Sequence, residues 1–268
     1  MFHVEPGRVV EVDDTRGPSD WKEHAAGGRL DEGRVPGGIA SLDIAAAAWH
    51  LPGMSLDVKI CGLRTPEAVD AALAGGSTHI GFIFFPKSPR HVTPDEAARL
   101  RERAQRKALV VAVTVDASDA QLDEIVATMR PDMLQLHGKE TPDRVLAVKA
   151  RYGLPVIKAL SIGEAADLGR LEPYKGVADR FLLDAKPPAG SELPGGNGVA
   201  FDWSILQGLG KGTDYLLSGG LTPDNVGEAL RQASPPGLDV SSGVESAPGV
   251  KDLGRIEAFF RAIELSRR

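Results

Sequence analysis

The chain has 268 residues, 42% of them hydrophobic and 25% charged, which is ordinary for a soluble globular protein and allows one large domain with a full core. Its formal net charge of −6 excludes a global basic field that would hold nucleic acid or an anionic membrane surface, so any phosphate has to be bound locally. The single cysteine, Cys61, excludes an intrachain disulfide framework and favours a reducing, cytoplasmic compartment.

The first 53 residues differ from the rest, because glycines, prolines and scattered charges interrupt any sustained hydrophobic period. We expect residues 1–53 to be a disordered extension with one short helix at Ile39–His50, or the result of a start placed upstream of Met54. The apolar run at Ile39–Leu51 is shorter than the ~20 residues that a membrane span needs. The sequence therefore predicts a main domain over residues 54–268.

From Ser55 onward, short apolar runs alternate with segments rich in Ala, Leu, Glu and Arg, which indicates parallel strands joined by crossover helices. The expected strands are Asp57–Cys61, His79–Phe84, Leu109–Val115, Met133–Leu136, Val156–Leu160, Arg180–Leu183, Tyr215–Leu217 and Leu238–Val240. The expected helices include Pro66–Ala74, Pro94–Arg106, Ala120–Met129, Pro142–Tyr152, Asp202–Leu209, Pro223–Gln232 and Leu253–Leu265.

Four of these helices are preceded by a threonine and open on a proline, which predicts a hydroxyl at the N-cap and proline at the first helical position. The four threonines are Thr65, Thr93, Thr141 and Thr222. The alternation also fits a doubly wound open sheet. Eight units with none left over, and glycine-rich loops after the last three strands, favour a closed (β/α)₈ TIM barrel with its site at the carboxyl ends of the strands.

The first expected strand ends at Cys61. A free cysteine is most often a small buried hydrophobic residue. The period of two along a strand, however, puts Lys59 and Cys61 on one side and Val58 and Ile60 on the other. We expect the first pair to face the barrel interior, where Lys59 would favour the thiolate of Cys61.

The sixth expected strand runs directly into Asp184. Its ordinary interpretation is a helix cap or a surface ion pair with Lys186. A carboxyl group at the carboxyl end of a barrel strand is also where catalytic groups arise, and apolar surroundings raise its pKa toward that of a proton donor.

Glycine-rich loops follow the sixth, seventh and eighth strands, at Gly195–Gly198, Ser218–Leu221 and Val240–Val244. Glycine lets backbone N–H groups approach an anion closely, and the serine hydroxyls add donors. Tight turns are the alternative. The expected phosphate ligands are Gly196, Gly198, Gly219, Gly220, Ser241, Ser242 and Gly243.

Arg90 follows the second strand in a rigid basic loop, and its planar guanidinium suits a substrate carboxylate, although a lone surface arginine would look the same in the sequence. His137 closes the fourth strand, and we expect it to be a packed or hydrogen-bonded histidine outside the chemistry.

Taken in order, these residues resemble the phosphoribosylanthranilate isomerase family over about residues 57–265. The segments that carry the resemblance are Lys59–Leu63, Gly81–Phe84, Pro86–Arg90, Gln135–Gly138, Leu183–Asp184, Phe201–Trp203, Ser218–Val226, Asp239–Glu245 and Pro248–Asp252.

The resemblance implies an aldose–ketose isomerase, an intramolecular oxidoreductase of tryptophan biosynthesis that works without metal or organic cofactor. Its substrate would be a phosphorylated small molecule, N-(5-phosphoribosyl)anthranilate, rearranged to the 1-deoxyribulose 5-phosphate product. The family's general base falls on Cys61 and its general acid on Asp184, and Arg90 matches the arginine that meets the anthranilate carboxylate. Monomer and homodimer both stay open.

Two other functions compete with this one. The histidine-pathway isomerase performs the same rearrangement on a two-phosphate substrate, but it expects aspartate in place of Cys61, and the loop at Val115–Ser118 has no glycine-rich phosphate motif. A non-catalytic phosphosugar-binding barrel would bind without turnover, and it does not explain why an acid and a base both stand at strand ends.

Overall fold

The computed structural model describes residues 56–186, 190, 195, 196, 198, 200–210 and 212–267. The extension at residues 1–53, its expected helix and Asn197 of the 195–198 loop lie outside the described residues. Within the described part of the chain, every helix is too short or too polar to span a lipid bilayer.

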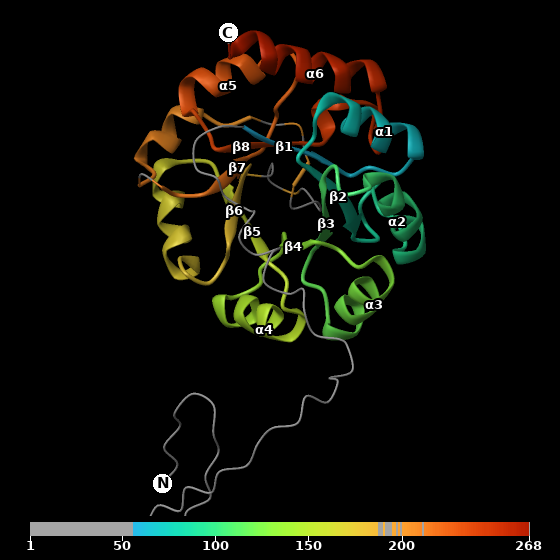
Figure 1. Cartoon of the computed structure of the whole chain (residues 1–268). Helices are drawn as coiled ribbons and strands as arrows, with labels where there is room; N and C mark the ends of the chain where they lie inside the picture. Colours follow the sequence, from blue (N-terminus) through green and yellow to red (C-terminus); the bar gives the residue numbers. More distant parts are fainter. Residues whose placement is uncertain are drawn as a thin grey trace, which may run out of the picture. The chain divides into compact units, whose positions relative to one another are not determined.

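Eight parallel strands form a closed barrel in sequence order, with the helices arranged around its outside (Figure 1). The strands are β1 (Asp57–Cys61), β2 (His79–Phe84), β3 (Leu109–Thr114), β4 (Met133–Leu136), β5 (Val156–Ile162), β6 (Arg180–Ala185), β7 (Tyr215–Leu217) and β8 (Gly237–Val240). The predicted TIM barrel is therefore confirmed, and the predicted strands agree with the observed ones to within two residues at their ends.

The helices between the strands pack their apolar sides on the outer face of the barrel. They are α1 (Pro66–Gly75), α2 (Pro94–Arg101) with η1 (Glu102–Ala104), α3 (Asp119–Met129), α4 (Pro142–Tyr152), η2 (Ala165–Tyr174), η3 (Trp203–Gly208), α5 (Val226–Ala233) and α6 (Leu253–Ser266). The expected helix after residue 202 is the short 3₁₀ segment η3. A two-stranded hairpin, β9 (Glu245–Ala247) and β10 (Val250–Lys251), follows β8 and was not predicted.

Three of the four threonine caps are confirmed, since Thr65, Thr93 and Thr141 each accept a hydrogen bond from the backbone N–H three residues on. The fourth prediction was wrong, because α5 begins at Val226. The side chain of Asn225 accepts from the Thr222 N–H at 2.8 Å and donates to the Gly220 carbonyl at 2.9 Å. These bonds hold a turn where the helix was expected to start.

The strand register decides which side chains enter the barrel. Neighbouring strands pair in register around the barrel, so residues that face the same side lie next to each other from strand to strand. The pairs include Cys61 with Gly81, Gly81 with Val111, Val111 with Met133 and Gln135 with Ile157. Lys59 closes the circle opposite Asp239 of β8. Because alternate residues face opposite sides of a strand, one set points inward throughout. Val58 and Ile60 belong to the outer hydrophobic core, as the sequence predicted.

Candidate active site

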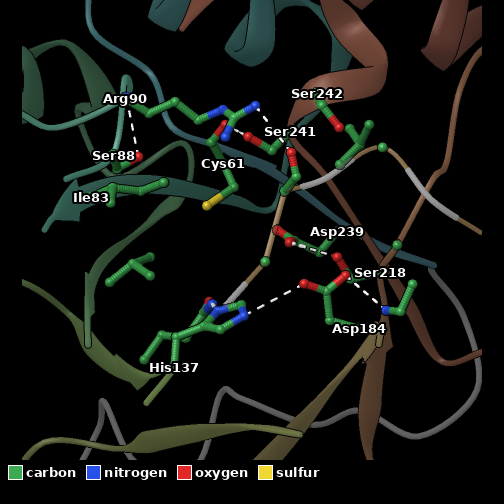
Figure 2. A pocket seen from close by; sticks show the side chains of 18 of the residues that line it. Cys61, Ile83, Ser88, Arg90, His137, Asp184, Ser218, Asp239, Ser241 and Ser242 are labelled. Carbon is green, nitrogen blue, oxygen red and sulfur yellow. Dashed lines mark hydrogen bonds and ion pairs between the residues drawn. The ribbon is translucent and has the colours of Figure 1, made fainter. Parts of the chain in front are cut away.

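A cavity opens at the carboxyl ends of the strands. Its walls combine inward-facing strand residues with the glycine loops that follow β6, β7 and β8 (Figure 2). The strand residues and those just beyond strand ends are Cys61, Ile83, Val113, Gln135, His137, Asp184, Ser218 and Asp239. The cavity thus lies at the end of the barrel where the sequence placed the site.

Cys61 ends β1 and is 5% exposed, with its side chain lining the cavity. Burial raises the pKa of the thiol above its ordinary value, although the positive charge of Lys59 opposes this effect and Asp239 adds to it. In the free protein the thiol is therefore held in its protonated form more firmly than an exposed cysteine would be.

Lys59 is fully buried and donates to Asp239 Oδ1 at 2.8 Å. Burial alone would lower the pKa of Lys59, but the charge of Asp239 and then that of Cys61 outweigh it, so the pKa is raised. Ser218 donates from its hydroxyl to the other carboxylate oxygen of Asp239 at 3.3 Å. The ammonium beside Cys61 therefore stays charged and keeps a fixed position.

Asp184 lies near the end of β6, 4% exposed, and lines the same cavity. Its Oδ1 accepts from the Ala185 N–H at 3.0 Å, and its Oδ2 lies 3.5 Å from His137 Nε2. These contacts orient the carboxyl group, and not the alternative surface ion pair with Lys186. Strands β7 and β8 separate β6 from β1, so the loops after β7 and β8 lie between the two side chains along the rim of the barrel.

The glycine loops line the cavity with strained backbone that glycine tolerates. Gly219 has φ +86°, and a Cβ there would come within 2.5 Å of the Ala185 nitrogen. The predicted phosphate ligands at the cavity wall are Gly196, Gly198, Gly219, Gly220, Ser241 and Ser242. Gly243 does not line it, and a Cβ at Gly243 would lie 1.7 Å from the Leu221 carbonyl oxygen, so this glycine serves close packing beneath the loop.

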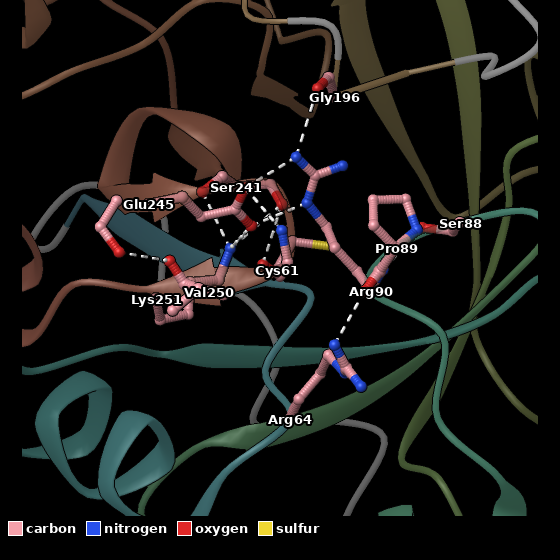
Figure 3. Close-up of polar contacts among 12 residues, drawn as sticks. Cys61, Arg64, Ser88, Pro89, Arg90, Gly196, Ser241, Glu245, Val250 and Lys251 are labelled. Atoms are coloured by element: carbon pink, nitrogen blue, oxygen red, sulfur yellow. Dashed lines mark hydrogen bonds and ion pairs between the residues drawn. The ribbon is translucent and has the colours of Figure 1, made fainter.

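Arg90 reaches the cavity from the loop after β2, but most of its fork is already engaged (Figure 3). Its Nε and Nη2 donate to the two carboxylate oxygens of Glu245 at 2.8 and 2.9 Å. Nη2 also lies 3.4 Å from the Gly196 carbonyl oxygen, a long contact. A substrate carboxylate would have to use the remaining side of the guanidinium.

Lys251, on β10, shares the same carboxylate, donating to Glu245 Oε1 at 2.8 Å and to the Ser241 carbonyl at 2.8 Å. Burial lowers the pKa of Lys251 despite the opposing charge of Glu245. Two cations thus surround one carboxylate next to the cavity. The sequence gives no sign that Glu245 and Lys251 belong to the site, because Glu245 reaches it through a long-range pair with Arg90 and Lys251 reaches it by pairing with Glu245.

A closed parallel barrel with a thiol, a carboxyl group and glycine-rich loops around one cavity at its carboxyl end defines the chain as an enzyme of the TIM-barrel class. The model of the family described as N-(5'phosphoribosyl)anthranilate (PRA) isomerase matches residues 58–262. The chain therefore belongs to the N-(5'-phosphoribosyl)anthranilate isomerase family.

Individual relatives agree with this membership. The chain is 69% identical over 214 residues to the N-(5'-phosphoribosyl)anthranilate isomerase of Mesorhizobium japonicum, an alignment that spans 80% of this chain and 98% of that protein. The crystal structure of phosphoribosyl anthranilate isomerase from Thermotoga maritima is 32% identical with a TM-score of 0.71, over 78% of this chain and 99% of that one. A second isomerase structure, in complex with reduced 1-(o-carboxyphenylamino)-1-deoxyribulose 5-phosphate, is 30% identical with a TM-score of 0.68 over the same shares.

Proposed function

We propose that the chain catalyses the Amadori rearrangement of N-(5-phosphoribosyl)anthranilate to 1-(2-carboxyphenylamino)-1-deoxyribulose 5-phosphate in tryptophan biosynthesis, with Cys61 as general base and Asp184 as general acid. The reaction is an aldose–ketose isomerisation, an intramolecular oxidoreduction. The observation that carries the proposal is that Cys61 and Asp184 line one cavity, with the glycine loops after β7 and β8 between them.

The acid acts first. Asp184 transfers its carboxyl proton to the ring oxygen of the ribose, the electron pair of the C1–O bond goes to that oxygen, and the nitrogen lone pair forms a C=N double bond to C1. The products of this step are an open-chain iminium and the Asp184 carboxylate. The position of Asp184 at the cavity wall supports the role, because its carboxyl group can reach a ligand bound there.

The base acts on the carbon next to the iminium. The Cys61 thiolate takes the C2 proton, the C–H electron pair forms the C1–C2 double bond, and the C=N electrons return to nitrogen. The resulting enolamine tautomerises to the ketone. Lys59 and Lys251 both lower the pKa of the thiol, partly offsetting the effect of burial, and so favour the thiolate that the step needs.

The substrate's two anionic ends suit two regions of the cavity wall. The phosphate fits the loops after β7 and β8, at Gly219, Gly220, Ser241 and Ser242. Gly196 and Gly198, from the loop after β6, line the same part of the cavity. Gly243 supports the loop after β8 by close packing. The anthranilate carboxylate fits the side of Arg90 that Glu245 leaves open. The protein needs no metal for either contact, and we place the enzyme in the cytoplasm as a monomer or homodimer.

The test is turnover by the purified full chain, followed by the loss of anthranilate fluorescence. Conversion of N-(5-phosphoribosyl)anthranilate supports the proposal. The histidine-pathway substrate, with its second phosphate, is assayed in parallel. Turnover of that substrate alone would move the chain to the other isomerase, and binding of the reduced product without turnover of either substrate would leave a phosphosugar-binding barrel.

A further inference from the structure

Lys251, the last residue of β10, carries a buried ammonium group beside the cavity (Figure 3). The ammonium donates to Glu245 Oε1 at 2.8 Å, to the Ser241 carbonyl oxygen at 2.8 Å and to the Ser241 hydroxyl oxygen at 3.2 Å. The positive charge of Arg90, on the far side of Glu245, also acts on it. An ammonium has three N–H donors and no acceptor, so each donor has one partner and the group has a fixed position.

The Ser241 hydroxyl connects this ammonium to the strand of the proposed general base. Its oxygen lies 3.1 Å from the carbonyl oxygen of Cys61. An ammonium can only donate and a carbonyl can only accept, so the hydroxyl accepts from Lys251 and donates its single hydrogen to Cys61. That hydrogen is therefore not available to a phosphate, which leaves the Ser242 hydroxyl and the backbone N–H groups of the glycine loops for phosphate binding.

The contact lies where β1 ends and the chain turns away from the barrel. Gly62 follows Cys61 with φ +74°, and its N–H donates to the Gly81 carbonyl oxygen at 2.9 Å. A Cβ at Gly62 would lie 2.7 Å from Arg90 Cδ and 3.2 Å from Ser241 Oγ. Ser241 thus packs closely on this turn, and a shift of Ser241 would move the backbone from which the thiol projects.

The charges of three side chains act on the Cys61 thiol. Lys59 and Asp239 pair with each other at 2.8 Å inside the barrel, so their opposite charges act on the thiol together. Lys251 reaches the thiol from the hairpin, and its charge lowers the pKa of Cys61 and so favours the thiolate. The same ammonium therefore contacts the end of β1 through Ser241 and stabilises the charged form of the base.

We propose that Lys251 is a positioning residue for the general base, which holds the end of β1 through the Ser241 hydroxyl and keeps a fixed positive charge beside the Cys61 thiol. The inference rests on the proposed function, because it gives the β9–β10 hairpin a part in the abstraction of the C2 proton. Lys251 acts as an ammonium and neither gives nor takes a proton. The C2 proton goes to Cys61, and the ammonium stabilises the thiolate until that transfer.

The direct test titrates the thiol of the full chain, in which Cys61 is the single cysteine. The rate of alkylation by iodoacetamide is measured against pH, because the thiolate is the form that reacts. In Lys251→Met the rise of this rate should move to higher pH, since a cation that favours the thiolate is lost. The matched control is Lys175→Met, which removes an exposed lysine paired with Glu172 and should leave the profile unchanged. An unchanged profile in folded Lys251→Met would overturn the inference.

The Ser241→Ala variant separates the hydroxyl contact from the charge. Lys251 keeps its contacts with Glu245 and with the carbonyl of residue 241, so the alkylation profile should stay in place. We expect kcat to fall about 10-fold because the base is less well placed, while KM changes less than threefold. A rise of KM with unchanged kcat would show that this hydroxyl binds the phosphate, and it would contradict the contact proposed for β1.

Steady-state kinetics of Lys251→Met complete the set. We expect kcat to fall about 10-fold or more, while KM changes less than threefold because Arg90 keeps its pair with Glu245. Circular dichroism melts are recorded for each variant. A lower melting temperature with parent kcat and an unchanged alkylation profile would limit Lys251 to the stability of the hairpin and would reject the positioning role.

Failure of this inference is distinguishable from failure of the proposed function. If Cys61→Ser retains the parent rate, Cys61 is not the base and the proposed mechanism fails. If Cys61→Ser is inactive while Lys251→Met and Ser241→Ala keep the parent kcat, the base stands and only the role of Lys251 is lost.

Discussion

The two ends of the barrel use buried charge in different ways. At the amino end, Arg180 of β6 bridges Asp57 of β1 at 2.7 Å and Asp214 before β7 at 3.0 Å. At the carboxyl end, Cys61 and Asp184 face a cavity, and Arg90 keeps part of its guanidinium toward it. The amino-end charges are paired as ions, whereas Cys61, Asp184 and part of Arg90 at the carboxyl end remain open to a ligand. The ion pairs that stabilise the fold thus lie at the amino end of the barrel, and the groups proposed for catalysis lie at its carboxyl end.

The largest expected effect is at the carboxyl end. Cys61→Ser and Asp184→Asn each remove one proton-transfer group, so kcat/KM should fall by about 10²-fold or more. Thermal unfolding should move little, because both changes conserve size. Steady-state rates compared with circular dichroism melts test this, and a rate within a few-fold of the parent chain for either folded variant would contradict the assigned roles.

The next effect belongs to the amino end. Arg180→Met leaves two partly buried carboxylates without their cation, and a fully buried pair would cost about 3–5 kcal/mol. Because Asp57 and Asp214 are 27% and 21% exposed, we expect about 2–3 kcal/mol in the free energy of unfolding, with kcat nearly unchanged.

The matched control for Arg180→Met is Arg103→Met, which breaks the exposed pair with Asp70 and should change the free energy of unfolding much less. Urea unfolding of both variants measures the difference. Equal losses in the two variants, or a large loss of kcat in folded Arg180→Met, would remove the contrast between the ends.

A smaller effect on activity is expected from Glu245, which contacts Arg90 and Lys251 beside the cavity. Glu245→Gln weakens the bidentate contact that orients Arg90 and leaves Lys251 and Arg90 facing each other. We expect KM to rise about 10-fold and kcat to change less, as for a lost binding contact. Glu264→Gln, on the exposed face of α6, is the control. A change confined to kcat would contradict the positioning of Arg90.

The pH profile gives the smallest and most specific effect. Burial raises the pKa of Cys61 in the free protein, so log kcat/KM should still rise with pH beyond the ordinary thiol value of ~8.5. Lys59→Gln removes a cation that lowers this pKa, and the rising limb should move to higher pH. A limb that moves to lower pH in this variant would show that Lys59 does not act on the thiol.

The sequence predicts the barrel well because its signals are local. Each strand is a short apolar run, three threonine caps form as expected, and the alternation along β1 correctly separates Lys59 and Cys61 from the outer core. The start of α5 fails because the two bonds of Asn225 override a local cap signal. The period alone also does not distinguish the short 3₁₀ segment η3 from an α-helix.

The site is predicted less completely because its second half depends on contacts distant in sequence. Glu245 meets Arg90 across 155 positions, and no local pattern announces the pair. His137 was expected to be a packed histidine, and its position between Gln135 and Asp184 becomes visible only when β4 and β6 face the same cavity. The ends of the predicted strands locate the candidate catalytic residues, but only the tertiary structure shows which residues contact them.

The most direct test of the central claim is a crystal structure of the chain with the reduced product analogue bound. We predict the phosphate on the loops after β7 and β8, with Cys61 Sγ and Asp184 Oδ both reaching the five-carbon unit directly or through one water, within about 2.6–3.2 Å for each hydrogen bond. An analogue that contacts only one of the two groups, or that binds with its phosphate away from those loops, would contradict the account.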